Sequence, residues 1–233
     1  MKQLLTLLMI FSLRSVSAEV FTLWPVRKGD GSQASAGNIL NGLRKQLLHK
    51  ENVVVNGVRL KMEVSQTDIP FDILLAQLKK ALGQDDFIPQ GSTVRIGYPI
   101  SGKRVERWLL IRNKTPQTTV FHMISPEKLS LPEGWPKELP PLPVGAEITQ
   151  VIQFPKRDCV YGSFRNAQGH PRDVLRQWTR FLEGGGWITA GAEAAVTGES
   201  GGDIFIRTRN GREVIWVSVS EDGSGNCYYK NAE

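Results

Sequence analysis

The sequence predicts an α+β protein with two related units of antiparallel sheet, one packed helix in each, and an N-terminal helical arm. Three observations lead to this prediction. The chain has 233 residues, 40% hydrophobic and 22% charged, which is typical of a globular protein of one or two domains. Apolar and polar residues alternate over many short segments, which is typical of half-buried strands. Similar sequence blocks also occur, in the same order, on both sides of a proline-rich stretch.

Residues 1–18 are predicted to be a secretory signal peptide. Lys2 provides the positive start, residues 4–13 form an apolar run, and Val16-Ser17-Ala18 supplies small residues for cleavage before Glu19. The apolar run is shorter than the roughly 20 residues that a membrane-spanning helix needs. We therefore expect an exported protein, periplasmic or secreted, with no stable membrane anchor after cleavage. The alternative is a buried N-terminal helix.

The first unit is expected to span residues 19–130. Its predicted elements are a strand at 20–26, an amphipathic helix at 38–50, a hairpin of 52–55 with 58–64, a helix from Pro70 through Leu82, and strands around 109–112 and 120–125. Asn56-Gly57 is a strong hairpin signal because both central residues of a type I′ turn need positive φ. Pro70 suits the first turn of a helix, and Asp72 complements its positive N-terminal end.

A proline-rich stretch at residues 131–143 is predicted to link the two units. It contains five prolines, and proline fixes φ and lacks an amide donor, so the segment should be extended and outside any sheet interior. The alternative is an ordered strap that packs across both units, with Trp135 as its anchor.

The second unit is expected at residues 144–233. Its predicted elements are strands at 147–154 and 159–164, a helix at 171–183, a strand at 187–190, a hairpin of 203–209 with 213–220, and a last strand at 226–230. The helix should end at Gly184-Gly185-Gly186.

An internal duplication is predicted from two sets of matching blocks. Residues 70–74 match 171–175 at an offset of 101, at the start of a helix in each half. Residues 109–112 match 204–207, and 120–125 match 215–220, both at an offset of 95. The difference of six residues would lie in the connection between helix and strand, where loops tolerate changes in length.

The second half resembles small exported bacterial α+β domains, most of them uncharacterised. The residues that carry the resemblance are the opening 140–146, the helix segment 172–178 that leads to Leu182 and Gly186-Trp187, and the β-meander that follows. The match covers about residues 140–230 and depends on common residue types, and Trp178 stands where the pattern often has Tyr. The resemblance implies a non-enzymatic domain and assigns no functional residue.

Cys159 and Cys227 are candidates for one disulfide bond. An even number of cysteines in an oxidising compartment suggests a pair, and a bridge across so long a loop would stabilise the fold by roughly 4 kcal/mol. The alternative is two buried thiols. A metal site is not indicated, because no further ligands stand at a suitable spacing.

The net charge gives little support for nucleic-acid binding. The whole chain carries a formal charge of +6, and loss of Lys2 and Arg14 with the signal peptide lowers it to +4. The basic residues are scattered among acidic ones and form no long tract. We therefore expect no nucleic-acid partner.

No catalytic motif is found. His49, His122 and His170 fall in a predicted helix, a predicted strand and a turn before a helix, without neighbouring acids or cysteines in any catalytic spacing. We therefore predict no catalytic residue, no cofactor and no metal.

Trp24, Arg104, Arg107 and Trp108 are candidates for contact with a partner. Tryptophan and arginine carry much of the energy of protein interfaces. Trp24 precedes a glycine-rich loop, and Trp108 follows two arginines. The alternative for Trp108 is a place in the core.

The leading hypothesis is an exported, non-enzymatic protein that binds another envelope protein. The second hypothesis is a binding module for an anionic polymer such as cell-wall glycan or surface polysaccharide, suggested by the basic mature chain and six tryptophans. The third is an envelope hydrolase that uses the histidines for acid–base chemistry.

Overall fold

A computed structural model describes residues 38–82, 88–90, 93–100, 103–190, 200–208 and 212–232. The predicted signal peptide at 1–18 and the predicted strand at 20–26, with Trp24, lie outside the described residues. In the described part, no helix is long and apolar enough to cross a membrane.

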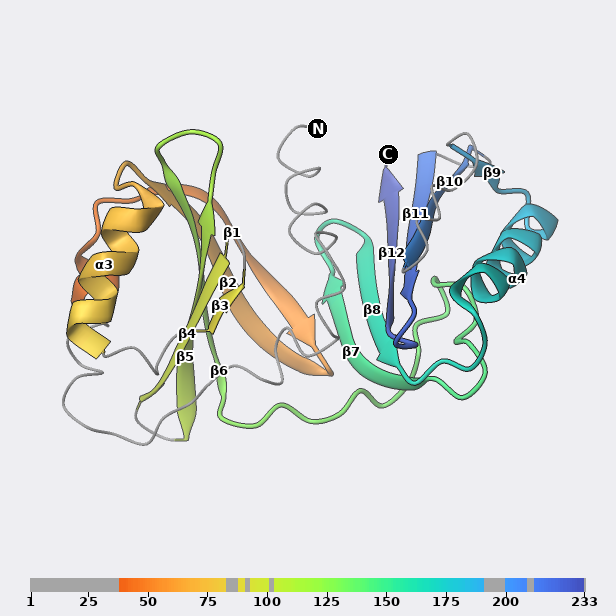
Figure 1. Ribbon diagram of the computed structural model, residues 1–233, viewed down its shortest axis with the longest axis horizontal. Coiled ribbons are helices and arrows are strands. Elements are labelled where there is room, and N and C mark those ends of the chain that lie inside the picture. Colours follow the sequence, from red (N-terminus) through yellow and green to blue (C-terminus); the bar gives the residue numbers. More distant parts are fainter. Residues whose placement is uncertain are drawn as a thin grey trace. The chain divides into compact units, whose positions relative to one another are not determined.

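The described strands, in chain order, are β1 (Gln46–Val55), β2 (Val58–Thr67), β3 (Ile88–Gln90), β4 (Thr93–Ile100), β5 (Arg104–Arg112), β6 (Thr118–Pro126), β7 (Glu147–Phe154), β8 (Cys159–Arg165), β9 (Ile188–Thr189), β10 (Ser200–Arg207), β11 (Arg212–Ser220) and β12 (Gly225–Ala232). The helices are α3 (Phe71–Leu82) and α4 (Pro171–Gly184), and residues 38–42 are also helical (Figure 1).

The predicted α+β class is wrong. Most of the described chain forms one large antiparallel sheet in which hydrogen-bonded neighbours follow the order β3-β4-β5-β6-β2-β1-β7-β8-β12-β11-β10-β9. The helical part is small. The sequence predicted two separate small sheets, but the hydrogen-bonded strands continue as neighbours through one sheet.

The chain divides into two compact units. The N-terminal unit contains the described residues of Phe21–Val53 and Val58–Leu129. The C-terminal unit contains Val54–Gly57 and the described residues of Ser130–Glu233. The tip of the first hairpin therefore belongs to the C-terminal unit, where Val54 pairs with Gln153 and Val55 with Ile152.

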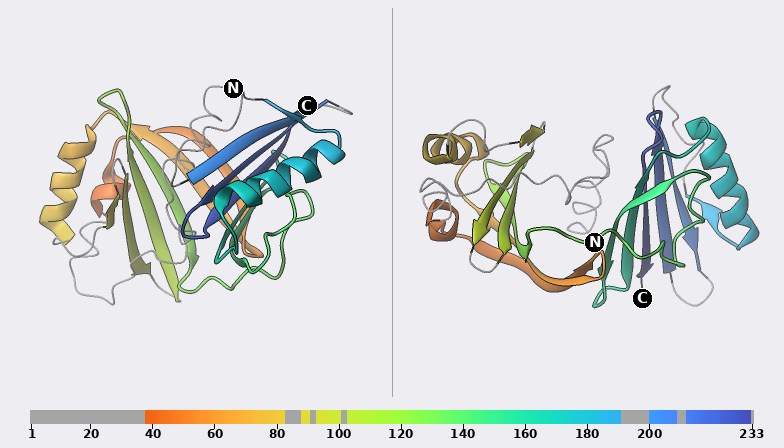
Figure 2. Two further views of the ribbon diagram at one scale, coloured as in Figure 1. Left: turned by 45° about the vertical axis from the view of Figure 1, so that its right-hand side comes forward. Right: turned by 90° about the horizontal axis from the view of Figure 1, so that it is seen from below.

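The N-terminal unit has its core between α3 and one face of its strands. Leu74 and Leu78 of α3 are fully buried against Ile96, Trp108 and other alternate residues of β4–β6. Residues 38–42 lie on the same side of these strands as α3, and Leu40 joins the core (Figure 2).

The predicted helix at 38–50 is wrong after residue 42. The chain enters β1 at Gln46 and continues to the Asn56-Gly57 turn. Asn56 and Gly57 have φ of 49° and 82°, as the predicted type I′ turn requires. The leucines at helical spacing do not share one buried face, since Leu40 is fully buried whereas Leu47 is 55% exposed. Sheet pairing therefore overrides the local pattern.

The C-terminal unit has its core between α4 and one face of β8 and β10–β12 (Figure 2). The helix begins as predicted: the His170 side chain accepts the Arg172 N–H at 3.2 Å, and Pro171 opens the first turn. Trp178 is buried in this core and donates its indole N–H to the carbonyl oxygen of Pro141.

The proline-rich stretch packs onto the C-terminal core. Leu139 is buried there, and Trp135 packs against the same cluster while donating to the carbonyl oxygen of Pro140 at 2.7 Å. A Cβ at Gly162 would lie 2.7 Å from both side chains, so this glycine allows the stretch to approach β8 closely. The whole stretch thus belongs to the C-terminal unit.

The matching blocks at an offset of 95 do not lie on corresponding strands. Each unit has a hairpin, a helix and a four-stranded meander whose last strand pairs with the second hairpin strand. In that order β5 corresponds to β11 and β6 to β12, whereas the blocks align β5 with β10 and β6 with β11. The similarity of these blocks reflects the alternating apolar pattern that all these strands share.

Candidate functional site

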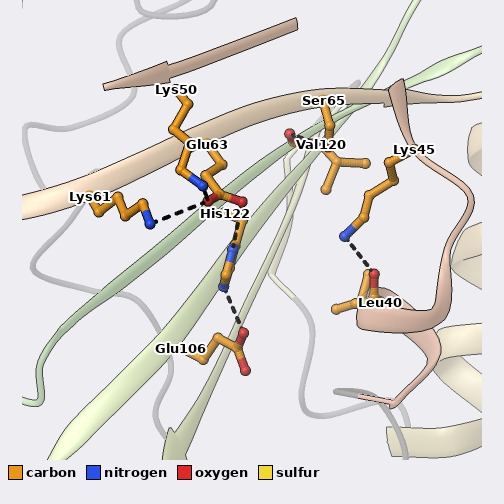
Figure 3. A network of polar contacts seen from close by, with 9 residues as sticks. All are labelled: Leu40, Lys45, Lys50, Lys61, Glu63, Ser65, Glu106, Val120 and His122. Atoms are coloured by element: carbon orange, nitrogen blue, oxygen red, sulfur yellow. Dashed lines mark hydrogen bonds and ion pairs between the residues drawn. The ribbon is translucent and has the colours of Figure 1, made fainter. Parts of the chain in front are cut away.

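Titratable side chains from four neighbouring strands form a row on the face of the N-terminal sheet that also carries Trp108 (Figure 3). Glu63 of β2 lies opposite His122 of β6, which in turn lies opposite Trp108 of β5. Lys50 of β1 pairs with Glu63, its Nζ 2.6 Å from the Oε1 atom. Alternation along the strands places these side chains on one face.

His122 lies between two carboxylates. Its Nε2 is 2.6 Å from Oε1 of Glu106, and its Nδ1 is 4.0 Å from Oε2 of Glu63. The imidazole also stacks on the Trp108 ring at a centroid distance of 4.0 Å. His122 and Glu106 are largely buried, with side chains 19% and 10% exposed. These contacts hold the ring in one orientation.

Lysines balance the charge of this row. The hydrogen bond from Lys50 is the main cause that lowers the pKa of Glu63, and it raises the pKa of Lys50 in turn. Lys45 donates to the carbonyl oxygen of Leu40 at 2.8 Å and lies over the Trp108 ring at 4.6 Å. Burial lowers the pKa of Lys45, although Glu63 and Glu106 oppose this shift.

The row places an imidazole directly beside a carboxylate, with Nε2 of His122 2.6 Å from Oε1 of Glu106. No hydroxyl or thiol of the described chain hydrogen-bonds to His122, so no nucleophile is activated there. Among the described residues, no cluster of three His, Cys, Asp or Glu side chains is arranged to hold a metal ion. The stacking of His122 on Trp108 places the row at the border of the core of the N-terminal unit.

The predicted interaction candidates are not brought together. Trp108 is fully buried in the core of the N-terminal unit. Arg107 is 3% exposed and points to the opposite face of the sheet, since it neighbours Trp108 on the same strand. Arg104 is exposed at the start of β5, opposite Pro126. Trp24 lies outside the described residues.

The predicted disulfide is absent: Cys159 and Cys227 are both buried free thiols. Their strands β8 and β12 are neighbours, but Cys227 pairs with Gly162 and Cys159 with Lys230. An offset of three residues separates the cysteines by about 10 Å along the strands, beyond the reach of a disulfide. It also directs the two side chains to opposite faces of the sheet.

An apolar row that the sequence did not predict lies on the C-terminal sheet, on the face opposite α4. The register connects Val55, Ile152, Tyr161, Tyr228, Trp216 and Ile204 across six strands. The row is buried from Val55 to Tyr228, and its outer end at Ile204 is 45% exposed. The alternating apolar and polar residues of β10 and β11 predicted two strands. They did not predict which face of these strands would be exposed.

The exposed end of this row extends over the sheet edge. Ile188 of β9 is 71% exposed and pairs with Ile206, which shares a face with Ile204. Ile206 and Trp216 are partly buried. We call Ile188, Ile204, Ile206 and Trp216 the edge surface.

Comparison with protein-family models, with curated proteins and with solved structures finds no match.

Proposed function

We propose that this is an exported, non-enzymatic protein that binds another protein of the cell envelope through the edge surface. The observation that carries the proposal is the exposure of Ile188 (71%) and Ile204 (45%) at the open end of a row of apolar side chains. Contiguous exposed apolar side chains mark sites of interaction more often than isolated ones.

The neighbouring strand geometry supports this choice. β9 has only two residues, which pair with Phe205 and Ile206 of β10, and the N–H of Ala190 donates to the carbonyl oxygen of Ile204 at 2.7 Å. Residues 200–203 of β10 therefore have no described partner on that side. An extended segment of a partner can therefore add backbone hydrogen bonds along residues 200–203 of β10 and place apolar side chains on the adjacent edge surface. The occupant we propose is a protein segment with alternating apolar residues.

The N-terminal sequence supports export. A positive residue, a short apolar run and small residues before Glu19 are the features that signal peptidase recognises. Cleavage there predicts a mature chain that begins with Glu19 and no longer carries the apolar run of residues 4–13. N-terminal sequencing of the protein purified from its host tests this part of the proposal.

The binding test uses the tagged full-length precursor expressed in its own host, with crosslinking in living cells and purification at low and high salt. A single stoichiometric protein that survives high salt is the expected result. Ile188→Asp with Ile204→Asp should abolish its recovery. Ile73→Asp on α3 is the matched control, because Ile73 is 52% exposed on the other unit and should leave recovery unchanged.

The other two hypotheses predict different outcomes. Recovery of wall polymer alone, lost as salt rises, would favour an anionic polysaccharide ligand. An envelope-hydrolysing activity that disappears when His49, His122 and His170 are replaced together would overturn the non-enzymatic assignment. Equal recovery of the protein partner by the double variant would refute the role of the edge surface.

A further inference from the structure

Two buried arginines lie next to each other on the face of the N-terminal sheet opposite α3. Arg95 of β4 pairs with Leu109, and Arg107 of β5 pairs with Gly97. The arginines are thus diagonal neighbours on adjacent strands, with Cα atoms about 7–8 Å apart. Ile96 and Trp108, which alternate with them, point into the core beneath α3.

Neither guanidinium is neutralised by the described chain. Arg95 is 8% exposed and Arg107 is 3% exposed, yet no described carboxylate forms an ion pair with either. Glu51 is buried on β1, three strands away from β5, or about 14 Å, and it pairs with His49 at 3.0 Å.

Several N–H groups of this arginine pair are also without acceptors. Nη2 of Arg107 donates to the carbonyl oxygens of Pro126 at 3.4 Å and Glu127 at 3.2 Å, which fixes the guanidinium in place. Its Nε and Nη1 atoms are buried without a hydrogen-bond partner, as is Nε of Arg95. Buried donors without acceptors are costly, and a buried charge without a counterion costs more.

The pair remains positively charged at neutral pH. Burial lowers the pKa of both guanidinium groups, and that of Arg107 falls to about 10, still well above 7. Gly97 stands opposite Arg107 and adds no side chain of its own to this face. Fixed donors without acceptors and a positive charge that no described carboxylate neutralises are the features that favour binding of an anion.

We propose that Arg95 and Arg107 together bind a small oxyanion, such as a carboxylate, phosphate or sulfate group. Two or more anionic oxygens satisfy the free Nε and Nη1 donors and neutralise the buried charge. The small exposed fractions of both side chains favour a compact ion over a polymer. This site is in the N-terminal unit and is independent of the edge surface, so the two proposals can fail separately.

The test measures the midpoint of thermal unfolding of the full chain at constant ionic strength. Phosphate, sulfate and acetate are each titrated in turn, with chloride as the reference salt. The comparison shows which of the three chemical classes of oxyanion binds. At least one of the three should raise the midpoint in a saturable way, because a ligand that binds only the folded state stabilises it. No difference from chloride with any of them would overturn the proposal.

Variants assign the effect to the two arginines. Arg107→Met and Arg95→Met remove the charge but keep the length of the side chain, and each should raise the dissociation constant about tenfold or more. Arg104→Met is the matched control, because Arg104 lies exposed on the same strand as Arg107 and should leave binding unchanged. If Arg107→Met does not fold, the anion affinity of Arg95→Met alone tests the site. Anion binding that survives Arg95→Met unchanged would identify an adventitious ion only and refute the site.

Discussion

Replacement of Asn56 by alanine should destabilise the C-terminal unit far more than an ordinary turn substitution. Asn56 is only 4% exposed and connects two segments of that unit to the hairpin tip. Its Oδ1 accepts the N–H of Val151 at 2.8 Å, and its Nδ2 donates to the carbonyl oxygen of Ser130 at 2.9 Å. Its own N–H also donates to the carbonyl oxygen of Val151 at 2.8 Å.

The expected loss of unfolding free energy is about 3–5 kcal/mol. The buried N–H of Val151 loses its acceptor, which costs about 1–3 kcal/mol. The lost bond to Ser130 adds about 1 kcal/mol. The residue also has φ of 49°, where alanine is less favourable than asparagine by about 1 kcal/mol. Asn56→Gly removes the same bonds without the strain, so it should cost about 1 kcal/mol less.

Asn166→Ala is the matched control for the strain alone. Asn166 has φ of 60° and is exposed, and none of the described hydrogen bonds involves its side chain. Its replacement should cost about 1 kcal/mol. Urea unfolding followed by tryptophan fluorescence measures all three variants. A loss for Asn56→Ala within 1 kcal/mol of the control would show that the side-chain hydrogen bonds contribute little.

Three further predictions concern packing, pH and the thiols. Gly225→Ala should cost about 1–3 kcal/mol in chemical denaturation, because a Cβ there would collide with the Phe164 ring, whereas Gly134→Ala has open space and should stay within about 0.5 kcal/mol of wild type. The hydrogen bond from Arg207 lowers the pKa of Glu213 below its usual 4.5, so the wild type should be more stable than Glu213→Gln above pH 4.5. This difference in unfolding free energy should vanish as the pH falls through the lowered pKa of Glu213 in the folded protein. A constant difference down to about pH 2 would contradict this. Both cysteines should react as free thiols after denaturation without reductant, and reductant should leave the unfolding midpoint unchanged. Fewer than two reactive thiols, or a midpoint that reductant lowers, would show a disulfide and contradict the register of β8 against β12.

Local sequence signals predicted individual elements well. The strands at 147–154 and 159–164 match β7 and β8 within one residue, and the helix at 171–183 matches α4 within one residue. These elements have strong local determinants. The strands show alternating apolar and polar residues, and the helix has His170 and Pro171 at its start and a glycine triplet at its end. The Asn56-Gly57 turn was found for the same reason.

Features that depend on pairing between distant strands were not predictable. Whether Cys159 and Cys227 face each other depends on the register of β8 against β12, and one residue of slip changes the face of every side chain. The proximity of Arg95 to Arg107 depends likewise on the β4–β5 register. The helical spacing of leucines in 38–50 was misleading because β1 takes over from residue 46.

The most direct test of the central claim is photo-crosslinking from the edge surface in living cells. A photoreactive amino acid at position 204 should yield one protein adduct, and the same residue at position 73, the exposed site on α3, should yield none. Ile188→Asp in the same chain should remove the adduct from position 204. Adducts of equal intensity from both positions, or none from position 204, would contradict the claim that this protein binds a partner through its C-terminal sheet edge.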